Sequence, residues 1–128
     1  MKILVTPTSF SNGNRSEAKD LLENFADDII YNPFGRPLAA KEIIPLLDGT
    51  DGYIAGLDYI TAEVIEQAPA SLKVISRYGT GYDRVDLKAA FQKGIAVTNT
   101  PGVNSESVAD LAFGLMISVA RRIPVLNE

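Results

Sequence analysis

The sequence predicts an α/β fold, a doubly wound parallel sheet of five strands in a three-layer αβα arrangement. Short runs rich in valine and isoleucine alternate along the 128 residues with segments whose apolar residues recur at helical spacing. Each apolar run stops at a proline, a glycine or a polar residue, as buried parallel strands do. Repeated strand–helix–strand units imply right-handed crossovers, so all strands are expected to run in the same direction.

The expected strands each contain valine or isoleucine, and they lie at 2–7, 28–33, 51–57, 72–78 and 95–100. Four short helices are expected at 16–26, 39–49, 61–69 and 86–94, followed by a longer one at about 105–122. Ser16, Thr61 and Asp86 stand where helix N-caps belong, and Gly49 and Gly94 stand where helices end. The segment 9–16 is expected to be a polar loop. This order of elements favours a flavodoxin-like sheet.

Composition excludes several classes of function. The chain is 46% hydrophobic and 22% charged with a net charge of −4, so it offers no basic surface for nucleic acid or anionic lipid. It contains no cysteine and no histidine, which removes disulfides, thiol nucleophiles, the usual zinc ligands and the usual general base. The opening "MKILVTPTSF" is unlike a signal peptide, and no apolar tract is long enough to cross a bilayer. We therefore expect a cytoplasmic protein without a membrane span or a metal site.

A G-x-G motif follows the fourth expected strand, where Gly79 and Gly81 flank Thr80. A dinucleotide fingerprint needs a third glycine at the position of Arg84, so the spacing excludes that function. Successive N–H groups in a glycine turn form a small anion-binding concavity that suits a carboxylate. Ligands of such sheets bind outside the carboxyl ends of the strands, where this motif lies. From spacing alone, a tight strand-to-helix connection without a ligand is about equally well supported.

A second polar segment, 98–107, leaves the fifth strand and turns at Pro101 and Gly102 toward the last helix. Asn104 precedes the apolar part of that helix, so a capping role is favoured over a ligand contact. Asp110 inside the helix is more typical of a solvated or paired carboxylate than of a catalytic one.

Three motifs carry a resemblance to a known family. They are G-T-G-Y-D-x-V-D at 79–86, K-G-I-x-V-T-N-T-P-G at 93–102 and N-S-x-S-V-A-D at 104–110. Residues 71–124 resemble the D-isomer-specific 2-hydroxyacid dehydrogenases, most closely their phosphoglycerate dehydrogenase branch. The resemblance implies a substrate-binding domain over 1–104 and a long interdomain helix over 105–128. In that family an NAD-binding Rossmann domain follows and carries the catalytic arginine, glutamate and histidine.

The resemblance also implies what the whole enzyme does. It would transfer hydride between the nicotinamide of NAD and a 2-hydroxy or 2-oxo acid, as a homodimer. We expect this chain to be truncated before the Rossmann domain, to contain no catalytic residue and to be inactive alone. Hydride transfer needs a bound nicotinamide and a general acid–base, and this sequence supplies neither.

By position, the resemblance assigns a set of binding residues to this chain. The substrate-binding set comprises Arg77, Tyr78, Gly79, Thr80, Gly81 and Asn104, and the cofactor-binding set comprises Val108 and Asp110. Asp110 replaces the glutamate usual in the family. Ala55 stands where phosphoglycerate enzymes place an arginine, and Asp58 follows closely, so a phosphate would lose a bidentate partner and meet a carboxylate. We therefore expect a 2-hydroxy acid other than 3-phosphoglycerate.

An alternative from another class is a standalone flavodoxin-like domain that binds a small carboxylate for regulation. The last helix distinguishes the two hypotheses, because in a fragment its apolar residues would be partly bare. These residues are Leu111, Leu115, Met116, Ile117 and Val119. A receiver-type signalling domain is disfavoured, because the first strand ends in "TPTSF" instead of clustered acidic residues.

Overall fold

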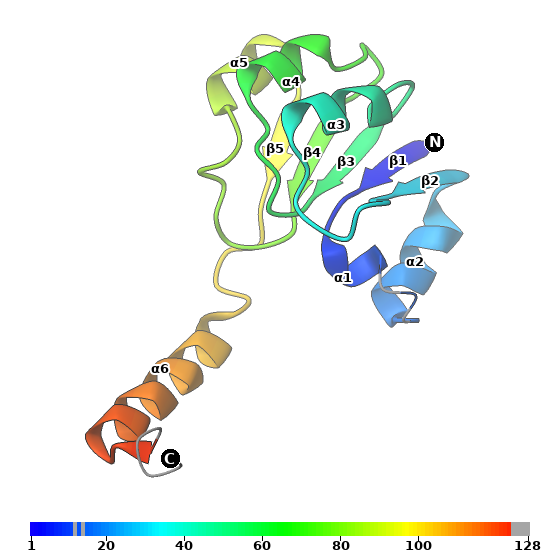
Figure 1. Ribbon diagram of the computed structural model, residues 1–128. Helices are drawn as coiled ribbons and strands as arrows, with labels where there is room; N and C mark the ends of the chain where they lie inside the picture. Colours follow the sequence, from blue (N-terminus) through cyan, green and yellow to red (C-terminus); the bar gives the residue numbers. More distant parts are fainter. Residues whose placement is uncertain (12, 14, 124–128) are drawn as a thin grey trace.

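A five-stranded parallel sheet forms the centre of the domain in the computed structural model, which describes residues 1–11, 13 and 15–123 (Figure 1). The strands are β1 (Lys2–Val5), β2 (Asp28–Tyr31), β3 (Gly52–Ala55), β4 (Val74–Arg77) and β5 (Ala96–Thr98). Their order is β2-β1-β3-β4-β5, and all four pairings are parallel. In register, Val5 of β1 lies opposite Tyr31 on one side and Ile54 on the other. This confirms the flavodoxin-like order expected from the sequence.

Helices cover the two faces of the sheet unequally. The helices are α1 (Thr8–Ser11), α2 (Glu17–Phe25), α3 (Ala40–Leu46), α4 (Ala62–Gln67), α5 (Leu87–Gln92) and α6 (Ser105–Ala120). Helices α3, α4 and α5 lie together on one face, whereas α1 and α2 lie on the other, near β1 and β2 (Figure 1). The chain crosses the sheet in one direction from β1 to β2 and in the opposite direction from β2 to β3, β4 and β5. Because the connections are right-handed, this reversal places α3 to α5 on the face opposite α2.

The ends of the elements confirm most of the expected caps. The Ser16 hydroxyl accepts a hydrogen bond from the amide of Lys19 at 3.2 Å, and the Asp86 carboxylate accepts one from Ala89 at 3.0 Å. Gly49 and Gly94 adopt φ of +68° and +71°, the left-handed conformation that ends a helix at glycine.

Two local expectations are wrong. Thr61 occupies the expected N-cap position of α4, but its side chain makes no capping hydrogen bond. Residues 8–11, which overlap the expected loop, form the single turn of α1 directly after Pro7. This turn begins the β1–α2 connection and brings its side chains to the carboxyl edge of the sheet.

The hydrophobic core lies mainly between the sheet and helices α3 to α5. Leu4, Tyr53 and Ile75 contribute to it from the strands, and Ile43 and Ile65 from the helices, all at most 1% exposed. By contrast, α2 buries no residue completely. The carboxyl ends of β1, β3 and β4 therefore extend directly from the best-packed part of the domain.

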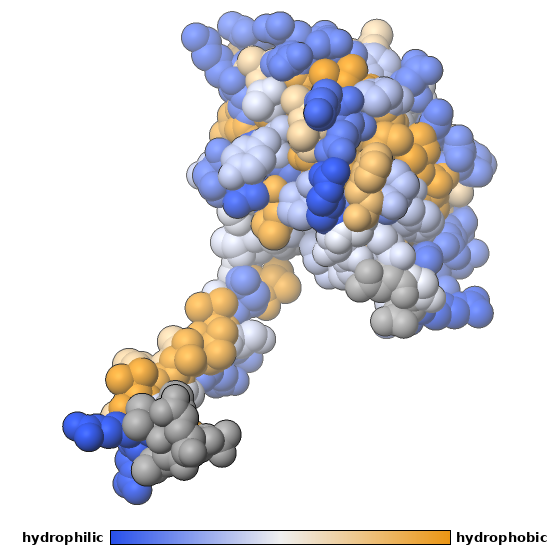
Figure 2. All heavy atoms as spheres, viewed as in Figure 1, coloured by the Kyte–Doolittle hydropathy of each residue, from blue (hydrophilic) through white to orange (hydrophobic). Residues whose placement is uncertain are grey.

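Helix α6 leaves the domain after β5 and extends away from it (Figure 1). Its apolar side chains form an exposed surface along the helix (Figure 2), as the fragment hypothesis predicts. They include Leu111, Leu115, Met116, Ile117 and Val119, all at least half exposed. Across the part of the chain that the structure describes, no helix combines the length and hydrophobicity needed to span a membrane.

Candidate functional site

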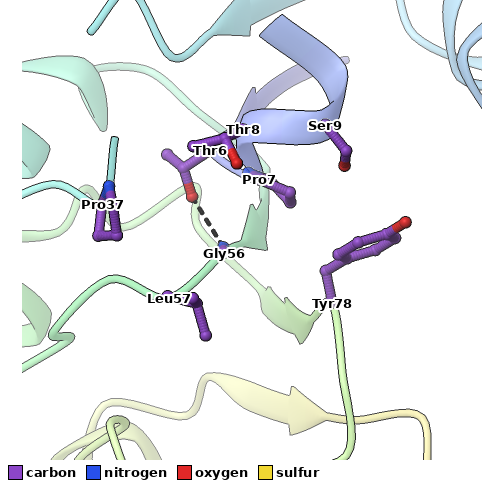
Figure 3. Close-up of a pocket in the computed structure, with 8 residues that line it drawn as sticks. All are labelled: Thr6, Pro7, Thr8, Ser9, Pro37, Gly56, Leu57 and Tyr78. Atoms are coloured by element: carbon purple, nitrogen blue, oxygen red, sulfur yellow. Dashed lines mark hydrogen bonds between the residues drawn. The ribbon is translucent and has the colours of Figure 1, made fainter. Parts of the chain in front are cut away.

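A pocket of about 340 Å³ opens at the carboxyl edge of the sheet (Figure 3). Residues 6–9 line it after β1, Gly56 and Leu57 after β3, Tyr78 after β4, and Pro37 from the segment before α3. This is where an open parallel sheet binds its ligands, because the loops there diverge and leave a crevice.

The walls of this pocket are largely apolar with a few hydroxyl groups. Pro7, Pro37, Leu57 and the Tyr78 ring supply the apolar surface, and residues 8 and 9 supply hydroxyls (Figure 3). The Tyr78 ring packs edge-on against Phe10 of α1, with centroids 5.7 Å apart and planes at 85°. An edge-to-face aromatic pair of this kind is favourable, so α1 supports one wall of the pocket.

Gly56 is required by the close approach of two strand ends beneath the pocket. A Cβ at this position would lie 3.0 Å from the Cα of Pro7 and 3.2 Å from the carbonyl oxygen of Thr6. Both atoms belong to the backbone, so they cannot move aside as a flexible side chain would. The ends of β1 and β3 therefore meet only because residue 56 has no side chain.

The glycine loop beside the pocket presents backbone N–H groups. Gly79 has φ of +141°, and its own amide donates to the Arg77 carbonyl at 3.0 Å. The next two amides, those of Thr80 and Gly81, donate to no acceptor within the described residues. A Cβ at Gly79 would meet no atom within 4 Å, so the loop faces open space. Two consecutive N–H groups are thus available to an anion.

The segment between β5 and α6 fixes this loop from one side. The Thr100 amide donates to the Gly79 carbonyl at 3.1 Å, and the Asn99 side-chain amide donates to the Thr80 carbonyl at 2.7 Å. The Thr80 hydroxyl lies 3.1 Å from Oδ1 of Asn104, to which it donates. These bonds join residues about twenty positions apart, so the loop conformation is held without a ligand.

Arg77 fixes the same loop from beneath. Its side chain is buried, with only 4% of the residue exposed. Nε donates to the Gly81 carbonyl at 3.0 Å, and Nη1 donates to the Ala55 carbonyl at 2.9 Å. The guanidinium therefore joins the glycine loop to the end of β3. Its expected contact with substrate stays a prediction, whereas this bracing role is what the structure shows.

Asn104 corrects the expectation of a capping side chain. It occupies the N-cap position of α6, but its side chain makes no capping hydrogen bond. Its Oδ1 accepts from Thr80 instead, which brings Asn104 to the glycine loop as the binding hypothesis requires. Val108 and Asp110 lie beyond it on the exposed helix α6, and neither lines the pocket. Their contact with a cofactor stays a prediction.

Asp58 corrects a second expectation. The sequence places this carboxylate where a phosphate bound in the cleft would meet it, but the residue is 0% exposed and lies beneath the pocket. Ala55 is equally buried in β3, so a longer side chain there would enter the core instead of the cleft. Sequence reasoning misses Pro37, whereas residues 6–10, "TPTSF" after the first strand, are expected at this edge.

The arginines next to the pocket already have partners. Arg36, which precedes Pro37, pairs with Glu42 at 2.6 Å, and this hydrogen-bonded pair lowers the pKa of Glu42 to about 2. Arg84 donates to the Leu57 carbonyl at 2.6 Å and lies 4.5 Å above the Tyr59 ring. Among the described residues, no group of acidic side chains is placed to hold a metal ion. Each of these two guanidinium groups therefore already has a hydrogen-bond partner within the chain.

Comparisons with known proteins identify the family of this chain. The model of the family "D-isomer specific 2-hydroxyacid dehydrogenase, catalytic domain" matches residues 7–121. A glyoxylate reductase of Korarchaeum cryptofilum is 46% identical over 88 residues, which cover 68% of this chain and 26% of that protein. This chain thus spans about a quarter of that relative's length.

Solved structures show the same relationship. The TT0316 protein of Thermus thermophilus superimposes with a TM-score of 0.80 at 38% identity, covering 96% of this chain and 38% of that one. An NAD⁺-bound 3-phosphoglycerate dehydrogenase of Entamoeba histolytica gives a TM-score of 0.69 at 30% identity, covering 92% and 37%. With its sheet order, its glycine loop and the family match in agreement, this chain belongs to the D-isomer specific 2-hydroxyacid dehydrogenases, within their catalytic domain.

Proposed function

We propose that this chain binds the carboxylate of a 2-hydroxy or 2-oxo acid for an NAD-dependent D-2-hydroxyacid dehydrogenase. The observation that carries the proposal is the pair of available amides at Thr80 and Gly81, next to the pocket that Tyr78 lines. Backbone N–H groups donate strong, charge-assisted hydrogen bonds to a carboxylate and need no charged side chain. The carboxylate would lie over the glycine loop, and the substituent on the 2-carbon would enter the pocket.

The pocket supports a small, uncharged substituent. Its walls are apolar with hydroxyl groups, and the arginines beside it are engaged. The Asp83 carboxylate adds a negative charge near the loop, with Oδ1 3.0 Å from where a Gly81 Cβ would stand. This charge would repel any bound anion, and a phosphate, which carries more charge than a carboxylate, more strongly. Glyoxylate, the substrate in the name of one relative, carries no substituent that needs a cation.

The nicotinamide cofactor would be held mainly by parts of the enzyme outside this chain. NAD supplies the hydride acceptor or donor, but the one G-x-G loop here lacks the third glycine of a dinucleotide site. The residues of this chain thus do not fit the main NAD site, and we derive no catalytic step from them. The bare apolar side of α6 supports a contact with a Rossmann domain or with a second subunit.

Two measurements test the proposal on the protein as its source makes it. Its intact mass is compared with the 13.8 kDa of this chain, and NADH oxidation is followed with glyoxylate, pyruvate and phosphohydroxypyruvate. We expect a larger mass and turnover of the two small acids in preference to the phosphorylated one. The isolated chain should show no turnover. Turnover by the pure chain, or a preference for the phosphorylated acid, would contradict the proposal.

The second candidate is a carboxylate-binding module without catalysis. The loop held open by Arg77 and Asn104 supports binding in its own right. A mass equal to 13.8 kDa, together with carboxylate binding and no turnover, would favour this candidate.

A further inference from the structure

We infer that the buried carboxylate of Asp58 is a positioning residue that fixes three walls of the pocket relative to one another. Its oxygens accept hydrogen bonds from donors in three separate segments: the end of β1, the segment before α3 and the end of β3. Each of these segments contributes a lining residue to the pocket.

The geometry is explicit at each wall. The amide of Leu38, next to Pro37, donates to Oδ1 at 2.6 Å. The amide of Gly56 donates to Oδ2 at 3.1 Å, and the hydroxyl of Thr6 donates to the same oxygen. Each of these three donors is therefore a pocket residue or the direct neighbour of one. Leu38 and Thr6 lie 20 and 52 positions from Asp58 in the sequence, so this one carboxylate joins distant parts of the chain.

The site is built for an acceptor without hydrogens of its own. A fourth donor, the Tyr53 hydroxyl, reaches Oδ2 at 3.1 Å. Burial, together with the charge of Asp58, raises the pKa of Tyr53 well above its usual value, so the phenol stays protonated and donates. No buried side-chain nitrogen or oxygen in the described part of the chain lacks a partner. Both oxygens of a carboxylate accept hydrogen bonds. In an asparagine, an NH₂ group would replace one of these oxygens and would face N–H or O–H donors instead of accepting from them.

Asp58 thus acts on the ligand indirectly. It touches no open space, but Leu57 lines the pocket between Gly56 and Asp58. If the three segments separate, the pocket walls lose their present spacing and the pocket changes shape. The expected effect on affinity rests on the proposed function, whereas the effect on wall geometry does not.

The test compares Asp58→Asn with Val64→Ala in the full chain. Val64 is a core residue of α4, 1% exposed, that neither lines the pocket nor hydrogen-bonds to Asp58. The NMR chemical shifts of the backbone amides of Ser9, Leu57 and Tyr78 report the conformation of the pocket walls. Titration with oxamate, a 2-oxo acid analogue whose substituent is uncharged, measures affinity. Asp58→Asn should shift the wall resonances and weaken oxamate binding at least tenfold. Val64→Ala should lower the thermal midpoint without either change.

The outcomes separate the two hypotheses. Equal shifts of the wall resonances in both variants would overturn the positioning role of Asp58, because they would reflect a general destabilisation of the fold. No oxamate binding by the unmodified chain would count against the proposed function, while the wall resonances would still test Asp58. If Asp58→Asn does not fold, Thr6→Val removes the hydroxyl that donates to Asp58 and that accepts from the Gly56 amide at 2.9 Å, while preserving side-chain shape. It should shift the amide resonances of Leu57 and Tyr78. Unchanged resonances in a folded Thr6→Val would also overturn the inference.

Discussion

Replacing Gly79 with alanine tests the glycine loop at its most informative position. Gly79 has φ of +141°, a conformation that residues with a side chain rarely adopt, and a Cβ there would meet no atom within 4 Å. The substitution therefore displaces nothing in the core. Its cost to folding arises from backbone strain alone, about 1–3 kcal/mol in free energy of unfolding.

The cost to binding should be larger, because the methyl group enters the open space over the loop. We expect it to disturb the hydrogen bonds from Thr80 and Gly81 to a bound carboxylate. A hydrogen bond to a charged group contributes about 1.5–3 kcal/mol, so losing two costs about 3 kcal/mol or more. Because each 1.4 kcal/mol is about tenfold in Kd, affinity for a small 2-oxo acid should fall about 100-fold.

The matched control is Gly94→Ala at the end of α5. Gly94 also has a positive φ, +71°, and a Cβ there would likewise meet no atom within 4 Å, but this glycine lies outside the pocket. Urea unfolding measures the stability of both variants, and calorimetric titration with oxamate measures their affinity. Both variants should lose stability, and only Gly79→Ala should lose binding. Unchanged affinity in a folded Gly79→Ala would show that this glycine serves the turn alone.

Three further predictions concern charges. The pKa of Glu42 is lowered from 4.5 to about 2, chiefly by its hydrogen bond with Arg36. The pair therefore stabilises the fold above about pH 4.5, and this contribution is lost as the pH falls toward 2. Glu42→Gln should therefore flatten the pH dependence of unfolding in that window, and an unaltered profile would contradict the pairing. Lys93 donates to three carbonyls at the end of α4 at 2.6 to 2.7 Å, so Lys93→Met should lower unfolding free energy in urea by about 1 kcal/mol. Asp83→Asn removes a negative charge near the glycine loop and should tighten oxamate binding up to about fivefold at low salt, corresponding to about 1 kcal/mol. Weaker binding by this variant would refute a carboxylate bound at the glycine loop.

The order of elements can be predicted because it depends on local patterns and one rule of handedness. The runs of valine and isoleucine predict the five strands, and right-handed crossovers place the connecting helices on the two faces of the observed sheet. Helix α1 escapes prediction because its four residues, 8–11, are too few to show a helical period. Capping preferences are local, so they favour Asn104 as a cap, whereas its actual partner, Thr80, lies 24 positions away.

The candidate site can be predicted only in part. Gly79 and Gly81 carry a local signature, since glycine after a buried strand indicates an unusual turn. Asp58 carries none, because its role depends on donors from residues 6, 38 and 56 that meet only in the folded chain. From sequence it stands at a strand end, where ligands bind, and nothing local shows that its side chain turns into the core. The direction of a side chain at such an edge is a tertiary property.

The two halves of this site, loop and pocket, are both held in place by bonds that need no ligand. Arg77 and the segment before α6 fix the glycine loop, and Asp58 connects three walls of the pocket. Binding should therefore cost little ordering of the protein, and weak affinity in the isolated chain would reflect missing contacts on the open side of the cleft. If so, addition of the remaining enzyme should increase affinity without changing the conformation of residues 78–81. A large rearrangement of that loop on ligand binding would show that its conformation is selected by the ligand instead.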